Sequence, residues 1–544
     1  MKIVVIDPAE NEVNTTTGPV RQLVTLHEEE SSVSLIPLVL YENCTKIPDA
    51  PRGIIWVEEE YRHDNEIDSI IELPDPIKSK VWIEGNFSVN IGGTVIIRIQ
   101  LYNGRNERRT RGGDLVRVWL KEDRLGAKTT AQVTDNTDGS YTAIVKTFWV
   151  GSPQVQAAII SPREVIATAF ERRYKCPPVL MNTAVFQHPS DANMVEKTPC
   201  NYDNQIPGYK HVCNFTQENY NRPWYCGKPR LSCQYWTMAA DVNLWNTGKE
   251  KELLSNMEQE LMSLKYTARK IITNITLTVT EDSKGETVLT PKSKCNHLNK
   301  SVTWDVTSPT GYFYNNKWTN RQCSYSDLDL KTCLKNTTVI LIGDSTTRQM
   351  FERIKQLIPC EWLTDILSPG EKHHPALCAN KSMDFNLGWN LHSLPFCTTN
   401  TPRQYFKSLS AYLNELSDSK RYVVVIHFFA HFLNHHSHVF YETLLDLRKG
   451  INDILARNDH VSIVIKGPHA YSFSKSPDHV VWMPDMYSKA YEKLILDVMK
   501  DLQHRIYYLN CMDMTVCTEQ WHIHAEQYVI NSMVDNVFNF VCDK

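Results

Sequence analysis

Residues 337–348 read Thr-Thr-Val-Ile-Leu-Ile-Gly-Asp-Ser-Thr-Thr-Arg, and this stretch decides the fold of the C-terminal part of the chain. It begins with a short apolar run and passes through Gly343-Asp344-Ser345 into a segment with apolar residues at helical spacing: Met350, Phe351, Ile354, Leu357 and Ile358. This pattern predicts a buried strand, a tight turn and a helix with one apolar face.

Strands and helices continue to alternate up to the C-terminus. Further strands are predicted at 421–429, 460–466 and 506–512, and further helices at 440–458, 483–504 and 525–540. Alternation of this kind is typical of a mostly parallel α/β sheet with helices on both faces. Sites in such sheets gather at the C-terminal ends of strands, where we expect Ser345 and Asp513, with His524 on the same rim before the last helix.

The N-terminal part of the chain has a different period. Short segments of alternating polar and apolar residues lie at 94–101, 116–120 and 141–145, and turns rich in Gly, Asn and Asp separate them. This pattern predicts an all-β, immunoglobulin-like sandwich. We therefore expect a multidomain protein with four parts: a flexible lead-in (1–43), a β-sandwich (44–175), a Cys-rich connector (176–320) and an α/β domain (321–544).

Composition excludes several classes of protein. The 544 residues include 58 Lys and Arg against 62 Asp and Glu, a formal charge of -4, so no basic excess favours nucleic acid as a partner. No stretch approaches the roughly 18 apolar residues that a transmembrane helix needs. The first twenty residues lack the sustained apolar core of a signal peptide.

Cysteines and glycosylation sequons nevertheless indicate an oxidising compartment. The chain has 15 cysteines, none in the paired C-x-x-C spacing of a zinc site, and this favours disulfides. N-x-S/T sequons begin at Asn14, Asn43, Asn86, Asn214, Asn274, Asn299, Asn336 and Asn380. We expect a protein of the secretory pathway, in the Golgi lumen or secreted, whose entry signal is not present in this chain.

The turn at Ser345 has the layout of a nucleophile site. A serine hydroxyl needs a base to remove its proton and donors to stabilise the resulting oxyanion. A turn between a buried strand and a helix N-terminus exposes the hydroxyl and directs backbone N–H groups at developing negative charge. Gly-Asp-Ser alone is a weak signal, and Ser345 could instead simply cap the helix.

From about Cys44 to Cys542 the chain resembles the neurexophilin and PC-esterase domain (NXPE) family. Gly343-Asp344-Ser345-Thr346-Thr347-Arg348 is similar to that family's GDSxxR motif. Other matching stretches are Cys213-Asn-Phe-Thr, Pro223-Trp-Tyr-Cys226-Gly-Lys-Pro, Gly311-Tyr312, Trp318, Cys323, Asp513-Met-Thr515 and Phe538-Asn-Phe-Val-Cys542. The resemblance implies an N-terminal neurexophilin-like β-sandwich and a C-terminal SGNH/GDSL-like esterase domain.

The resemblance also implies roles for individual residues. Ser345 matches the nucleophile, Arg348 the arginine of this branch, and His524 the late histidine that serves as general base. The wider esterase pattern is D-x-x-H, but Trp521 stands where its aspartate belongs. Two replacements stay open: Asp513 orients His524 from another direction, or Glu519 and His522, an E-x-x-H pair, supply the base.

The remaining site residues are predicted from the same resemblance. His431 matches a family histidine that donates to the oxyanion or binds the glycan, with a histidine merely packed in the core as the alternative. Gly388 and Asn434 are candidates for the oxyanion hole. The neighbouring histidines have no carboxylate or thiolate to complete a usual ligand set, so we expect no metal.

The family implies a glycan-modifying O-acyltransferase that acetylates cell-surface or secreted glycans such as sialic acids. Acetyl-CoA is then the expected acyl donor, with no bound cofactor and a glycan or glycoprotein as substrate. One alternative is a glycan O-acetylesterase. Another is a non-catalytic secreted glycoprotein that binds a neurexin-like partner through its neurexophilin-like domain.

Overall fold

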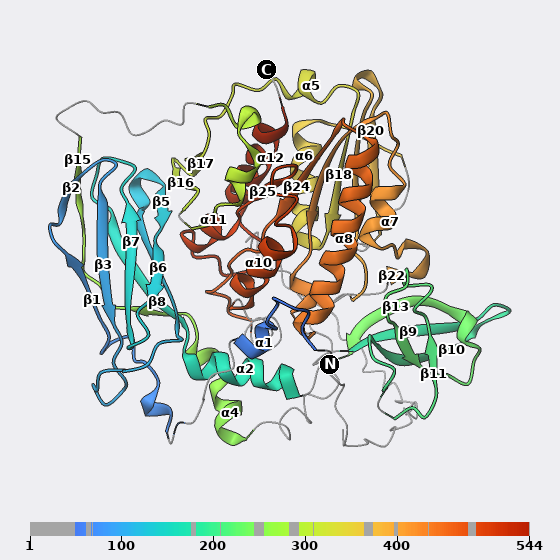
Figure 1. Ribbon diagram of the computed structural model, residues 1–544, viewed down its shortest axis with the longest axis horizontal. Coiled ribbons are helices and arrows are strands. Elements are labelled where there is room, and N and C mark those ends of the chain that lie inside the picture. Colours follow the sequence, from blue (N-terminus) through green and yellow to red (C-terminus); the bar gives the residue numbers. More distant parts are fainter. Residues whose placement is uncertain are drawn as a thin grey trace, which may run out of the picture. The chain divides into compact units, whose positions relative to one another are not determined.

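The computed structural model describes most of the chain (Figure 1). The described residues are 49–60, 67, 69–175, 181–206, 208–243, 255–281, 293–307, 309–363, 374–395, 401–433, 435–476 and 486–542. The lead-in predicted at 1–43 lies outside them. None of the helices in the described ranges has the length and apolar character needed to cross a membrane.

A seven-stranded sheet forms the centre of the C-terminal part. In spatial order its strands are β19 (Glu361–Trp362), β20 (Ala376–Asn380), β21 (Phe385–Asn390), β18 (Thr337–Gly343), β23 (Arg421–His427), β24 (Val461–Lys466) and β25 (Tyr507–Leu509). The five strands from β21 to β25 are parallel, and β19 and β20 add an antiparallel edge. Val423, Val424, Val425 and Ile426 are all buried, as expected for a strand covered on both faces.

Helices cover both faces of this sheet (Figure 1). On one face, α6 (Ser345–Leu357) and α12 (Gln527–Val541) pack their apolar residues against Val339 and Leu341 of β18. On the other face, α8 (Ser437–Arg457) and α10 (Tyr487–Val498) pack against Val424 and Ile426 of β23. Shorter helices are α5 (Leu330–Cys333), α7 (Leu409–Asn414) and α11 (Met512–Val516). The predicted alternation of strand and helix is thus present, and β18 leads directly into α6.

The N-terminal part contains two antiparallel sheets that share one core. One sheet has the order β1 (Lys80–Glu84), β3 (Thr94–Gln100), β7 (Ser140–Lys146) and β6 (Gln132–Asp135). The other has the order β14 (Arg269–Ile271), β8 (Gln154–Ser161), β4 (Leu115–Glu122), β5 (Ala127–Thr130), β16 (Gly311–Tyr314) and β17 (Lys317–Asn320). Ile97, Ile99, Val118 and Leu120 are fully buried between them. The short strands β2 (Ser88–Asn90) and β15 (Thr278–Thr280) pair beside them.

The sandwich therefore includes strands from 269–320, a stretch that the sequence pattern assigned to the connector. The β16–β17 hairpin turns through Asn315 and Asn316, both at positive φ, and β16 then pairs with β5 about 180 residues earlier in the chain. Pairing over such a separation leaves no local pattern in the sequence, so the boundary expected at 175 does not mark the end of the sandwich.

The remainder of the predicted connector forms a third antiparallel sheet rather than a simple disulfide-stapled link. Its strands are β11 (Val212–Asn214), β12 (Tyr225–Gly227), β10 (Asp191–Asn201), β9 (Met181–His188), β13 (Trp236–Asn243) and β22 (Thr401–Pro402). Phe186, Phe215 and Trp236 pack together beneath it. This half also contains the α-helices α1 (Val57–Glu60), α2 (Arg163–Lys175) and α4 (Asn256–Leu261).

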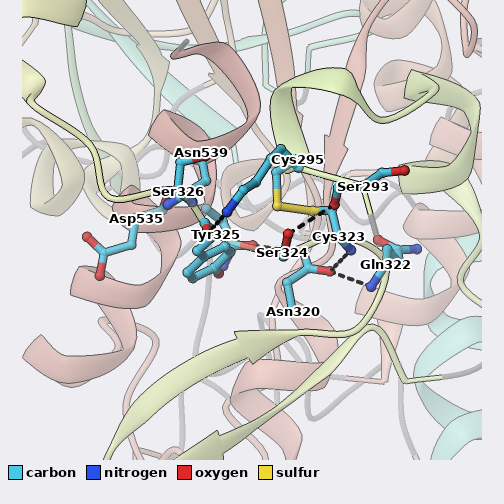
Figure 2. The surroundings of a disulfide bond; sticks show 12 residues. Ser293, Cys295, Asn320, Gln322, Cys323, Ser324, Tyr325, Ser326, Asp535 and Asn539 are labelled. Atoms are coloured by element: carbon cyan, nitrogen blue, oxygen red, sulfur yellow. Dashed lines mark hydrogen bonds between the residues drawn. A yellow bond between two sulfur atoms is a disulfide. The ribbon is translucent and has the colours of Figure 1, made fainter. Parts of the chain in front are cut away.

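Five disulfides join described residues: Cys200–Cys226, Cys213–Cys233, Cys295–Cys323, Cys333–Cys542 and Cys360–Cys378. Figure 2 shows the Cys295–Cys323 bridge, beside which the Ser326 N–H donates to Asn539 Oδ1 of α12 at 2.8 Å. Cys511 and Cys517 are buried free thiols. Disulfides were the predicted use of these cysteines, and five such bonds are typical of proteins from oxidising compartments.

Most described sequons are open to solvent. Asn86, Asn214, Asn274, Asn299 and Asn336 are exposed. Asn380 is only partly exposed, and its Nδ2 donates to the Pro359 carbonyl at 2.9 Å, so its amide is already engaged. Asn14 and Asn43 lie outside the described residues.

Candidate active site

Asp344, rather than Ser345, caps helix α6. The Asp344 Oδ1 accepts hydrogen bonds from the Thr346 N–H at 2.9 Å and from Thr346 Oγ1 at 2.7 Å. Ser345 is the first residue of the helix and remains partly exposed. The capping role that competed with a nucleophile role for Ser345 is thus filled by its neighbour.

Gly343 allows β18 and β23 to pack closely just before Ser345. A Cβ atom at this position would lie 2.0 Å from the His427 carbonyl oxygen, closer than any real contact. The last residue of β18 must therefore be glycine for β23 to approach it. This close packing places Ser345 at the C-terminal end of the central strand, where the sequence predicted it.

Ser345 and His524 lie within hydrogen-bond distance, with 2.6 Å between Oγ and Nε2. They are 179 residues apart in the chain, and both side chains are partly buried. His524 lies in the loop between α11 and α12, and Gln349 of α6 donates to the adjacent Ala525 carbonyl at 3.1 Å. A hydroxyl hydrogen-bonded to an imidazole is the arrangement in which histidine can remove the serine proton.

Asp513 does not contact His524. Its Oδ2 accepts hydrogen bonds from the Thr310 N–H at 2.6 Å, Thr310 Oγ1 at 3.0 Å and Asn510 Nδ2 at 3.1 Å. Burial raises the pKa of Asp513 to about 6. The carboxylate therefore holds the Thr310 segment against the end of β25, and it does not orient the imidazole as the sequence reading allowed.

The alternative pair, His522 and Glu519, is not brought together either. Glu519 is directed toward the β-sandwich, where its carboxylate accepts from Trp119 Nε1 at 3.1 Å and pairs with Lys270 at 2.6 Å. His522 accepts from the His524 N–H at 3.0 Å through Nδ1 and stacks on the His524 ring. Trp521, which replaces the aspartate of the esterase pattern, is 55% exposed. His522 thus supports the loop of His524.

His431 is buried beside a histidine that the sequence analysis did not single out. His431 Nδ1 lies 2.8 Å from His392 Nε2, and His392 Nδ1 lies 2.6 Å from the Ser393 carbonyl. Because a carbonyl can only accept, His392 donates from Nδ1 and accepts at Nε2, so His431 donates from Nδ1. Burial lowers the pKa of His431 to about 3. His431 is therefore neutral, with its Nδ1 proton directed at His392.

Charged and polar groups surround the Asp344 carboxylate. His427 Nε2 lies 3.6 Å from Asp344 Oδ2, while its Nδ1 donates to the Lys466 carbonyl at 2.8 Å. Burial opposes ionisation of Asp344, but Lys466 and the Thr346 hydrogen bond hold its pKa below the usual range. Asp344 is thus a carboxylate directly beneath the nucleophile turn.

The other predicted residues occupy different positions. Gly388 lies inside β21 opposite Ile340, before the end of the strand, so its place does not favour a role in the oxyanion hole. Arg348 lies with its guanidinium carbon 5.8 Å from the ring centre of Trp389, one turn beyond Ser345. Asn434 lies outside the described residues. In the ranges that the structure describes, no three His, Cys, Asp or Glu side chains are grouped as metal ligands.

The C-terminal part of the chain matches a known family. Residues 318–542 match the family model described as NXPE family member 4-like, C-terminal domain. This part of the chain is thus similar to the C-terminal domain of NXPE family proteins. This match confirms the resemblance over residues 318–542, and the matched segment contains the whole seven-stranded sheet together with Ser345 and His524.

Sequence reasoning missed three buried residues of this site: His392, Lys466 and His469. Lys466 ends β24 and His469 follows it by three residues, so the rule that strand ends carry functional groups could have found both. His392 follows β21, whose Phe-Asn-Leu-Gly-Trp-Asn sequence alternates apolar with polar or small residues, but no motif in the sequence marks this histidine.

Proposed function

We propose that this protein is a glycan O-acyltransferase of the secretory pathway that forms an acyl-enzyme on Ser345. The observation that carries the proposal is the 2.6 Å contact between Ser345 Oγ and His524 Nε2 at the C-terminal end of β18. The NXPE match supports it, because that family is related to esterases of the PC-esterase and SGNH type. We further propose sialic acids as acceptors and acetyl-CoA as donor, both from the family resemblance.

In the first half-reaction Ser345 Oγ attacks the acyl carbonyl while its proton passes to His524 Nε2. The carbon–sulfur bond of the thioester breaks, and the thiolate leaves with the proton that His524 returns. In the second half-reaction a glycan hydroxyl attacks the acyl-serine and gives its proton to His524. The bond to Ser345 Oγ then breaks, and His524 reprotonates the serine.

Other residues of the site have roles consistent with their surroundings. His431, neutral and with Nδ1 donating to His392, would contact the incoming glycan. Arg348 projects from the first turns of α6 and offers positive charge to an acidic sugar. In α6 the N–H groups of Thr346, Thr347 and Arg348 already donate to Asp344. The Ser345 N–H, at the N-terminus of the helix, would therefore be the donor to the oxyanion.

A test compares cells that express the protein, with an added signal sequence, as wild type or as Ser345→Ala. Released glycans are analysed by mass spectrometry for O-acetyl groups on sialic acids. A gain of acetyl groups with wild type alone supports a transferase, and a loss with wild type alone supports the esterase alternative. Equal glycans from two folded and correctly localised proteins would contradict both.

That last result would favour the non-catalytic alternative, in which the N-terminal β-sandwich binds a neurexin-like partner. Binding to neurexin ectodomains by wild type and by Ser345→Ala distinguishes this alternative, since a sandwich-mediated contact is unaffected by the serine. Binding that accompanies an acetylation difference would leave the enzymatic proposal intact.

A further inference from the structure

A continuous chain of buried hydrogen bonds joins the nucleophile turn to the loop that carries His524. It begins at Asp344, which accepts from Thr346 Oγ1 at 2.7 Å. Lys466 Nζ lies 3.4 Å from the same Thr346 Oγ1 and 3.5 Å from His469 Nδ1. His469 Nε2 lies 2.7 Å from the carbonyl oxygen of Ile523, the residue before His524.

The donor and acceptor groups present fix the direction of every hydrogen bond in this series. A carboxylate only accepts, so Thr346 Oγ1 donates to Asp344 and must accept from Lys466. A carbonyl only accepts, so His469 donates to Ile523 from Nε2 and accepts from Lys466 at Nδ1. Lys466 therefore donates in both directions, toward the nucleophile turn and toward the base.

The side chains that make these hydrogen bonds are buried and held in place by their neighbours. Asp344, Lys466 and His469 are each 1% exposed. The His469 ring packs edge-on against Phe429, with ring centres 5.3 Å apart. Burial, together with the nearby Lys466, keeps the pKa of His469 well below its usual range, which agrees with the neutral tautomer that the bonds require.

We propose that Lys466 and His469 are positioning residues that hold the peptide of His524 at a fixed distance from Ser345. The proposal rests on the proposed function, because it assigns to both residues the task of keeping the Ser345–His524 contact. Neither side chain touches the reacting atoms in this account. Loops hold catalytic groups less precisely than strands do, and this chain ties the His524 loop to the end of β24.

Three substitutions of His469 in the full-length protein test the proposal with p-nitrophenyl acetate as the probe. His469→Phe keeps the ring but removes both hydrogen bonds, and it should lower kcat by about 10- to 100-fold with little change in KM. His469→Gln retains an amide donor near the position of Nε2 and should remain within about 3-fold of wild type, whereas His469→Asn, whose amide is shorter, should resemble the Phe variant. Lys466→Met should behave like His469→Phe.

Hydrogen–deuterium exchange provides a readout that needs no activity. We expect faster uptake in the peptide covering 521–526 for His469→Phe and Lys466→Met, and wild-type uptake for His469→Gln. A matched control is His438→Phe, because His438 is a buried histidine of α8 that does not belong to this series of hydrogen bonds. This control should leave both uptake at 521–526 and kcat unchanged.

Two results would overturn the proposal. One is a folded His469→Phe variant with wild-type kcat and wild-type deuterium uptake, and the other is equal kcat for the His469→Gln and His469→Asn variants. If His469→Phe does not fold, the comparison of Gln with Asn decides. If wild type itself does not hydrolyse the probe, the proposed function fails. The exchange data then still decide whether Lys466 and His469 hold the loop.

Discussion

At the scale of single residues, Asp344 and Ser345 are neighbours with separate tasks. Asp344 caps α6 and supplies the negative charge that faces buried Lys466. Ser345 makes one described side-chain hydrogen bond, to His524. The two residues should therefore respond differently to substitution, one through stability and the other through reactivity.

We predict that Ser345→Ala changes the free energy of unfolding by no more than about 0.5 kcal/mol. Asp344→Ala should cost about 3 kcal/mol or more, because it removes a helix cap and leaves Lys466 buried without its counter-charge. Asp344→Asn keeps an acceptor for the Thr346 N–H and should fall between them. Urea denaturation of the three variants measures these losses of unfolding free energy. Equal losses for Ser345→Ala and Asp344→Ala would contradict the separate roles of the two residues.

Part of this site could be predicted from the sequence. The strand–turn–helix pattern and the family motif both mark Ser345, whereas the family resemblance alone marks His524. The contacts of Asp513 and Glu519 could not be predicted, since their partners Thr310 and Lys270 lie about 200 and 250 residues away in the chain. His392 could not be predicted either, because its role depends on the hydrogen bond to His431 and on no spacing in the sequence.

At the scale of elements, α10 and β25 meet through one buried carboxyl. Glu492 of α10 accepts from the Tyr508 hydroxyl of β25 at 2.7 Å, and burial raises the pKa of Glu492 to about 7. The folded protein therefore retains a proton that the unfolded chain releases at the ordinary pKa of a glutamate. Between these two pKa values the folded state binds more protons, so this contribution to stability is lost as the pH rises.

We predict that Glu492→Gln removes this pH dependence. Wild type should lose about 2 to 3 kcal/mol of unfolding free energy relative to the variant between pH 4.5 and pH 7.5. Urea denaturation of both proteins at several pH values measures the difference. A wild-type-minus-variant difference that stays constant over this range would show that Glu492 is already ionised in the folded protein.

At the scale of the whole molecule, the Cys333–Cys542 bridge joins the two ends of the α/β domain across 209 residues. Arg421 supports the same junction, since its Nη2 donates to the Val541 carbonyl at 3.3 Å. Cys360–Cys378 closes a loop of only 18 residues in the same domain. The two bridges therefore offer a matched comparison of long and short closures.

We predict that replacing Cys333 and Cys542 together by Ser costs about 5 kcal/mol, against about 3 kcal/mol for Cys360 and Cys378, because the longer loop gains more entropy in the unfolded chain. Denaturant unfolding of the two double variants provides the test. The loop-entropy explanation would be wrong if the short bridge contributed as much as the long one.

At this scale, a feature could be predicted from the sequence only where the strands that pair lie close together in the chain. The seven-stranded sheet was predictable in outline because its strands and helices alternate locally. The sandwich was predictable in type but not in extent, because β16 and β14 join it from 311–314 and 269–271. Both strands pair with partners more than 100 residues away, and no local period marks such pairing.

The central claim, that His524 activates Ser345, is tested most directly by labelling with a fluorophosphonate probe. Intact-protein and peptide mass spectrometry would follow the reaction in wild type, Ser345→Ala and His524→Ala. We predict a single label on Ser345 in wild type, none in Ser345→Ala, and labelling at least about 100-fold slower in His524→Ala. A His524→Ala variant that is labelled as fast as wild type, or a wild type that is folded but not labelled at Ser345, would contradict the claim.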